Sequence, residues 1–151
     1  MTMPSYVSLL IHFVWSTAQR EPLIRPSWQD QLYGYFGGIL RNKGGVLIAA
    51  GGMADHVHVL ASLPSTVDIA QMAGALKSNS SGWIHKNIDQ CKSFRWQSRY
   101  GAFSVSRSLQ DTLIEYIHHQ ADHHCGRTFQ EEFLALLKKH CIEYDERFLW
   151  D

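Results

Sequence analysis

Residues 46–63, VLIAAGGMADHVHVLASL, decide the fold that we predict for this chain. Two short runs rich in Val, Leu, Ile and Ala are separated by a turn that contains glycine. This pattern predicts a β-hairpin with strands at 46–52 and 56–63. Pro64 ends the second strand, because proline has no N–H for the hydrogen-bond ladder of a sheet. We therefore expect an antiparallel sheet at the centre of the fold.

His56 and His58 lie two residues apart in the second of these strands. Side chains at i and i+2 of a strand point to one face, so both imidazoles can bind one metal ion while Val57 and Val59 pack behind them. With nine histidines in 151 residues, such a pair can also arise by chance. Asp55, just before the pair, is either an acceptor that orients an imidazole from behind or a turn residue.

Further strands and helices are predicted on both sides of the hairpin. The predicted strands are 6–16 and 101–106, the latter starting near Trp96, and the predicted helices are 28–42, 66–77, 109–121 and 129–139. The resulting order β-α-β-β-α-β is that of the ferredoxin-like split βαβ fold. We therefore expect an α+β protein, with helices on one face of the antiparallel sheet and extra C-terminal helices.

Composition indicates one globular domain over residues 1–151. Of these residues 45% are hydrophobic and 19% are charged, which excludes a disordered chain. The apolar runs are too short to cross a bilayer, and the N-terminus does not resemble a signal peptide. The three cysteines lack CxxC spacing, as expected for reduced thiols in the cytoplasm. The glycine pairs do not form a phosphate-binding loop, so no nucleotide cofactor is expected.

The net charge of zero hides an uneven distribution along the chain. Residues 77–107 carry six basic side chains and one acidic side chain, a formal charge of +5. Five aromatic residues lie in the same segment: Trp83, Phe94, Trp96, Tyr100 and Phe103. Cations that follow a phosphate backbone, together with rings that stack on bases, are typical of single-stranded nucleic acid binding. A solvated surface without a partner is the alternative.

Tyr116 and Gln120 are the residues that we expect to act with the histidine pair. In a helix over 109–121 they lie on one face, because residues i and i+4 are neighbours there. A tyrosine hydroxyl beside a neutral oxygen ligand suits metal-dependent phosphoryl transfer. The alternative is a half-buried aromatic residue next to a surface glutamine.

Five segments in one order carry a resemblance to a known family. They are STAQREP at 16–22, MADHVHVLASLP at 53–64, LKSNSS at 76–81, WQSRYGAFSVS at 96–106 and YIHHQADHH at 116–124. Together they resemble the HUH-type single-tyrosine transposases of bacterial insertion sequences, the insertion-sequence 200-like group, over about residues 6–144. The resemblance covers nearly the whole chain.

This resemblance implies a DNA transposase in which His56, His58 and Gln120 hold a divalent ion, Mg²⁺ or Mn²⁺. Tyr116 would attack DNA and form a 5′-phosphotyrosine. Other ions such as Zn²⁺ are expected in a purified sample, because they bind imidazole more tightly. The resemblance also implies single-stranded DNA substrates with hairpin ends and a homodimer that shares its active sites between subunits. It implies a place at the nucleoid, in the cytoplasm of a bacterium or archaeon.

With this resemblance, the basic segment becomes the expected DNA surface. Phosphate contacts are expected from Lys77, Arg95, Arg99 and Arg107. Two alternatives remain open. One is a non-catalytic or domesticated protein that binds single-stranded nucleic acid on the same fold. The other is a metallohydrolase that uses only the histidine pair and water.

Overall fold

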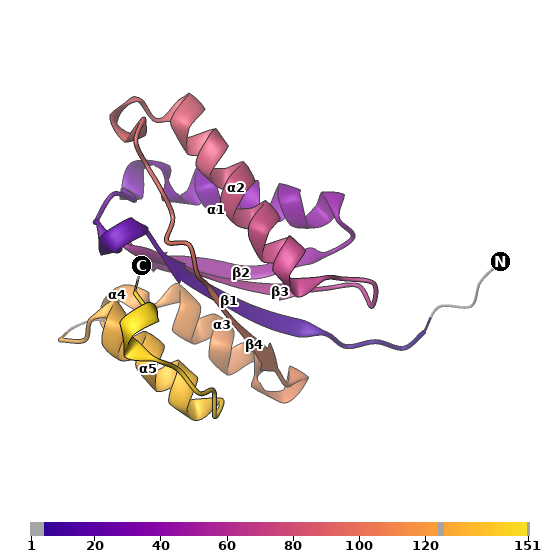
Figure 1. Cartoon of the computed structure of the whole chain (residues 1–151). Helices are drawn as coiled ribbons and strands as arrows, with labels where there is room; N and C mark the ends of the chain where they lie inside the picture. The colour runs from indigo at the N-terminus through magenta and orange to yellow at the C-terminus, as the bar shows by residue number, and fades with distance from the viewer. Residues whose placement is uncertain (1–4, 124–125, 151) are drawn as a thin grey trace.

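An antiparallel sheet of four strands forms the centre of the protein (Figure 1). The computed structural model describes residues 5–123 and 126–150. Its strands are β1 Leu10–Ser16, β2 Val46–Met53, β3 His56–Ser62 and β4 Gly101–Val105. They lie in the order β2-β3-β1-β4, and every neighbouring pair is antiparallel. This order is that of the split βαβ fold, so the predicted α+β class is confirmed.

Helices cover both faces of this sheet (Figure 1). The first pair, α1 Pro26–Asn42 and α2 Ile69–Asn87, lies on one face. On the other face lie α3 Gln110–His118, the short α4 Gln120–His123, and α5 Phe129–Lys139. Four 3-10 turns complete the described chain: η1 Ala18–Arg20, η2 Asp89–Cys91, η3 Arg107–Leu109 and η4 Glu146–Phe148. In the described ranges, no helix combines the length and apolar character needed to cross a membrane.

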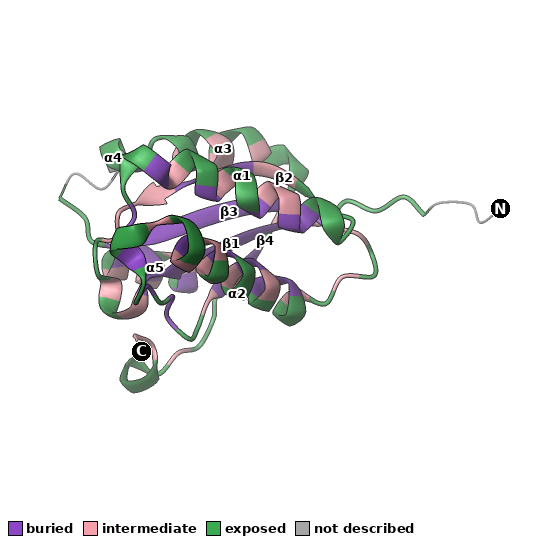
Figure 2. Ribbon diagram, turned by 90° about the horizontal axis from the view of Figure 1, so that it is seen from above, coloured by how far each residue is buried: buried purple, intermediate pink, exposed green. Residues whose placement is uncertain are grey.

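The two central strands are buried on both faces, as Figure 2 shows. Odd-numbered residues of β1 and β3 pack in the core beneath α1 and α2. Even-numbered residues point to the opposite face, because side chains alternate along a strand. On that face the register pairs Val14 with His58 and Ser16 with His56. The histidine pair therefore lies in the middle of the sheet, under α3 and α5.

The helix α2 continues ten residues beyond its predicted end at Lys77. Asp68 caps its first turn by accepting a hydrogen bond from the Gln71 N–H at 3.0 Å. The polar stretch after Lys77 stays helical because Ser80 is fully buried in the core. Its hydroxyl accepts a hydrogen bond from Trp96 Nε1 at 2.9 Å.

Other strands and helices also begin or end at residues that differ from the prediction. The first strand begins at Leu10, four residues later than predicted, and the last begins at Gly101, since Trp96 makes only an isolated bridge with Thr17. The tyrosine helix ends at His118 and not at residue 121, because His119 leaves the helical conformation with ψ near 37°. The helix α5 has its predicted bounds, with Thr128 accepting from the Glu131 N–H.

Candidate active site

Two glycines on the histidine face allow the C-terminal helices to approach the sheet closely. Gly51 of β2 lies opposite His58, and a Cβ there would be 2.2 Å from the Ile117 carbonyl oxygen of α3. Gly101 of β4 lies opposite Val14, and a Cβ there would be 2.8 Å from the Phe133 ring of α5. The absence of these two side chains lets α3 and α5 bring their own side chains to the histidine pair.

The structure brings His56, His58, Tyr116 and Gln120 together within one chain. Both histidines are completely buried, and Gln120 is 2% exposed. Gln120 Oε1 accepts a hydrogen bond from His56 Nε2 at 3.0 Å. The Tyr116 ring meets the His58 ring edge-on, with 5.8 Å between their centroids. The predicted residues therefore lie close together at one place in this chain.

Glu132 of α5 completes this site, and sequence analysis missed it. Its Oε1 atom lies 3.1 Å from His58 Nε2 and 3.4 Å from His56 Nε2. Its Oε2 atom accepts a hydrogen bond from the Tyr116 hydroxyl. The two oxygens of one carboxylate therefore connect the histidine pair to the tyrosine.

A signal for Glu132 does exist in the sequence. In α5 the buried side chains follow helical spacing at Phe129, Phe133 and Leu137, and Glu132 lies on the same face. An acidic residue on an apolar helix face is almost never fully buried unless it has partners. Glu132 is 1% exposed, so its position in this pattern indicates a partner on the sheet.

The electrostatics of the site couple His56 to Glu132. Burial would lower the pKa of His56, but hydrogen bonds to Asp55 and Glu132 outweigh it and raise the pKa to about 9. Burial would raise the pKa of Glu132, yet hydrogen bonds with His56 and His58 lower it to about 2. At neutral pH the pair is therefore an imidazolium that faces a carboxylate.

His56, His58 and Glu132 fit the requirements of a divalent metal site. Their ligand atoms all lie within 4.8 Å of one another, and all three side chains are buried. The donor set of two imidazoles and one carboxylate suits first-row divalent ions. Because metal ligands must be deprotonated, a bound ion would take the place of the proton on His56.

Asp55 and His12 contact the Nδ1 atoms of the two histidines, while the Nε2 atoms face Glu132. Asp55 Oδ1 lies 2.8 Å from His56 Nδ1. Of the two roles that the sequence allows for Asp55, this contact matches the acceptor that orients an imidazole. His12 Nε2 lies 2.8 Å from His58 Nδ1, with the two rings stacked at 5.0 Å. Burial, and next the neighbouring His58, hold the pKa of His12 well below its usual value, so this imidazole is neutral. Partners of this kind orient metal-binding imidazoles in proteins.

Three of the five aromatic residues of the basic segment cannot stack on bases, and for these three that interpretation is wrong. Phe94 and Trp96 are buried in the core beneath α1 and α2, and Phe103 is buried in a cluster with Phe129 and Phe133, with at most 8% of each exposed. Trp83 and Tyr100 are only partly buried, but they pack against the same core as Phe94. Aromatic spacing between charges thus reflected core packing.

The basic residues of this segment mostly lie at the surface. Arg95, Arg99 and Arg107 are exposed, and Lys77 Nζ donates a hydrogen bond to the Arg99 carbonyl at 3.0 Å. A cavity lies beside Tyr116, and none of these four side chains lines it. Their contacts with phosphate stay a prediction.

Comparison with known protein families identifies the chain. The family model described as "Transposase IS200 like" matches residues 5–120, which is most of the chain. The chain therefore belongs to the IS200-like transposase family. This match includes Tyr116 and the histidine pair but ends before α5, the helix that carries Glu132. No curated protein matches the chain.

Two solved structures are similar to this one. A candidate transposase from Deinococcus radiodurans R1 shares 25% identity at a TM-score of 0.65, covering 80% of this chain and 97% of its own. A REP-associated tyrosine transposase bound to a REP hairpin shares 15% identity at a TM-score of 0.60, covering 85% of this chain and 75% of its own. The second likeness concerns the fold alone.

Proposed function

We propose that this protein is a transposase that cleaves and rejoins single-stranded DNA through a covalent bond to Tyr116. The observation that carries the proposal is the contact of the Tyr116 hydroxyl with Glu132, whose other oxygen faces the two histidines. A nucleophile beside a metal-capable cluster is the arrangement that phosphoryl transfer by tyrosine requires. Membership of the IS200-like family supports DNA strand cleavage as the reaction class.

Mg²⁺ or Mn²⁺ is the cofactor that we propose for this site. His56, His58 and Glu132 would hold the ion, and Gln120 Oε1 would provide a fourth ligand on the same side. When bound, such an ion polarises the scissile phosphate and stabilises charge on the leaving oxygen. Mn²⁺ or Zn²⁺ is expected in purified protein, because imidazole binds these ions more tightly than Mg²⁺.

Tyr116 would act as the nucleophile, with its hydroxyl held in place by Glu132. The Tyr116 oxygen attacks the phosphorus, its proton passes to water, and the bond from phosphorus to the 3′ oxygen breaks. The 3′ oxygen takes a proton from water and leaves as a hydroxyl, while the 5′ end stays on the tyrosine. One phosphodiester replaces another, so a second 3′-hydroxyl can reverse the step and join the strand.

Single-stranded DNA with a hairpin is the substrate that we propose. A structural relative binds a REP hairpin, which supports the choice of a folded DNA end. The exposed cations Arg95, Arg99 and Arg107, with Lys77, are proposed to contact phosphates outside the active site. An enzyme with this substrate would work at the nucleoid, in the cytoplasm.

The family resemblance implies a homodimer, and we propose one for this protein. Sharing of active sites is not needed to build the centre, because Tyr116 contacts Glu132 of its own chain. We therefore propose that each subunit supplies its own tyrosine, whatever its oligomeric state.

Covalent trapping tests this function. The protein is incubated with Mn²⁺ and a labelled single strand that carries the hairpin end of its element, then denatured and separated by size. Wild type and the control Tyr35→Phe, on the exposed side of α1, should carry the label, whereas Tyr116→Phe should not. Binding of the strand without any adduct would instead favour a non-catalytic nucleic-acid-binding protein. Multiple-turnover hydrolysis that survives Tyr116→Phe would favour a metallohydrolase.

A further inference from the structure

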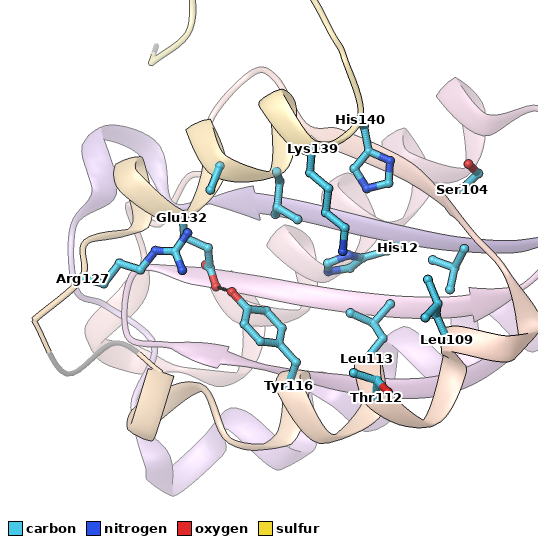
Figure 3. Close-up of a pocket in the computed structure, with 13 residues that line it drawn as sticks. His12, Ser104, Leu109, Thr112, Leu113, Tyr116, Arg127, Glu132, Lys139 and His140 are labelled. Carbon is cyan, nitrogen blue, oxygen red and sulfur yellow. Dashed lines mark hydrogen bonds between the residues drawn. The ribbon is translucent and has the colours of Figure 1, made fainter.

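A cavity of about 340 Å³ opens beside Tyr116, between α3, α5 and the edge of the sheet (Figure 3). This volume falls within the range of pockets that bind small ligands, roughly 300–1,000 Å³. Tyr116 and Glu132 form one end of its wall, so anything bound there adjoins the reacting atoms. Leu109 and Leu113 of α3 and Leu136 of α5 give it an apolar lining.

Basic side chains line the same cavity. Figure 3 shows Lys139 of α5 reaching inward toward His12, while Arg127 points toward the end that holds Glu132. The charge of Lys139 is close enough to contribute to the low pKa of His12. His140 also lines the cavity, and its ring stacks on Phe103 at 4.7 Å. The cavity therefore combines apolar walls with the positive charges of Lys139 and Arg127, and the Glu132 carboxylate lies at one end.

We propose that this cavity binds one unpaired nucleotide of the DNA strand, the one that adjoins the scissile phosphate. Its base lies among the leucine side chains, and its phosphate lies at Lys139. This proposal rests on the proposed function, which supplies the single strand and the scissile phosphate. An apolar slot beside a cation matches the two chemical parts of a nucleotide, a flat base and an anionic backbone.

The position of α5 makes this subsite a property of the C-terminal part of the chain. Ala135, Leu136, Lys139 and His140 all follow the segment that the family model matches. The family match therefore assigns nothing to these residues. Docking of α5 against Gly101 places Lys139 and Glu132 in one wall of the cavity.

The phosphate contact is tested by salt-dependent binding. Fluorescence anisotropy measures the affinity for a labelled single-stranded oligothymidine at several salt concentrations, without metal. Lys139→Gln should reduce the slope of log affinity against log salt by about 0.7, the loss of one contact with single-stranded DNA. Lys138→Gln removes the same charge from the same helix turn outside the cavity, and should leave the slope unchanged. Equal slopes for the two variants would overturn the proposal.

The base contact is tested by filling the cavity. Ala135 is exposed at the cavity wall, so Ala135→Trp can block the slot, and a thermal melt checks that the variant is folded. In wild type, removing the base next to the scissile phosphate should reduce cleavage roughly tenfold, as loss of one stacked base does. Ala135→Trp should cleave the intact strand more slowly than wild type by a similar factor. Removing the base should not slow Ala135→Trp any further, because both changes remove the same interaction. Two outcomes would contradict the subsite. In one, the abasic strand and Ala135→Trp slow cleavage independently, so that their effects add in full. In the other, wild type cleaves at an unchanged rate whichever base next to the scissile phosphate is missing.

Failure of the subsite can be separated from failure of the proposed function. If wild type forms no covalent adduct, the function is wrong, whatever the salt slopes are. If wild type forms the adduct while Lys139→Gln and Lys138→Gln behave alike, the function stands and the subsite is wrong.

Discussion

Replacing Gly51 with alanine should slow DNA cleavage although Gly51 touches neither substrate nor metal. The added Cβ would lie 2.2 Å from the Ile117 carbonyl oxygen, and ordinary contact begins at 3.4 Å. The helix α3 must therefore retreat by about 1.2 Å, the difference between these two distances. Tyr116 precedes Ile117 in the chain, so its hydroxyl moves with the helix. A misplacement of about 1 Å costs on the order of a hundredfold in rate.

Single-turnover cleavage at saturating single-stranded DNA measures this effect, since it separates the chemical step from product release. The matched control is Gly74→Ala on an exposed face of α2, where a Cβ meets no atom within 4 Å. That variant should cleave at the wild-type rate and gain about 0.4–1 kcal/mol of stability, because alanine reduces the entropy of the unfolded chain.

A folded Gly51→Ala protein that cleaves at the wild-type rate would contradict this expectation. It would mean that α3 does not rest on β2 when the tyrosine attacks. A thermal melt of the same preparation shows whether a lost activity comes from unfolding instead.

Three other outcomes follow from the same geometry. Mn²⁺ at a hundred times its dissociation constant should stabilise the protein by about 2.7 kcal/mol, a rise in Tm of roughly 5–10 °C, and His56→Ala should abolish the rise. Glu132→Gln should weaken Mn²⁺ binding in calorimetry by about tenfold or more, while Glu131→Gln on the exposed face of α5 should not; equal affinities would remove Glu132 from the ligand set. Phe133→Ala should lower the free energy of unfolding in urea by about 3–5 kcal/mol, because this ring fills the contact of α5 with Gly101; a loss below about 1 kcal/mol would show that α5 is not docked there.

Local patterns in the sequence were sufficient to predict the sheet and the histidine face. The hairpin at 46–63 and the order of elements determine the strand order, and period-two spacing determines that His56 and His58 share a face. Tyr116 and Gln120 were also expected beside the histidine pair, and the structure places them there, while their roles stay a prediction. These inferences need only short-range information, which one sequence contains.

Glu132 was missed because its role depends on long-range docking. Its own helix was predicted with the correct bounds, but nothing local shows that α5 crosses the sheet over the histidines. The two glycines that admit α3 and α5 could not be interpreted for the same reason. Conversely, the aromatic residues between 83 and 103 were assigned to the surface, since alternation with charges does not reveal which side of a segment faces the core.

We propose that one chain assembles the whole site and that its own Tyr116 attacks DNA. Wild type is mixed with a size-tagged His56→Ala chain, which lacks a metal ligand but keeps its tyrosine, and the two are given labelled single-stranded DNA with Mn²⁺. A denaturing gel then shows which chain carries the label. We expect the covalent adduct on the wild-type chain only. An adduct on the His56→Ala chain would mean that its tyrosine acted in the partner's site, and it would contradict the claim.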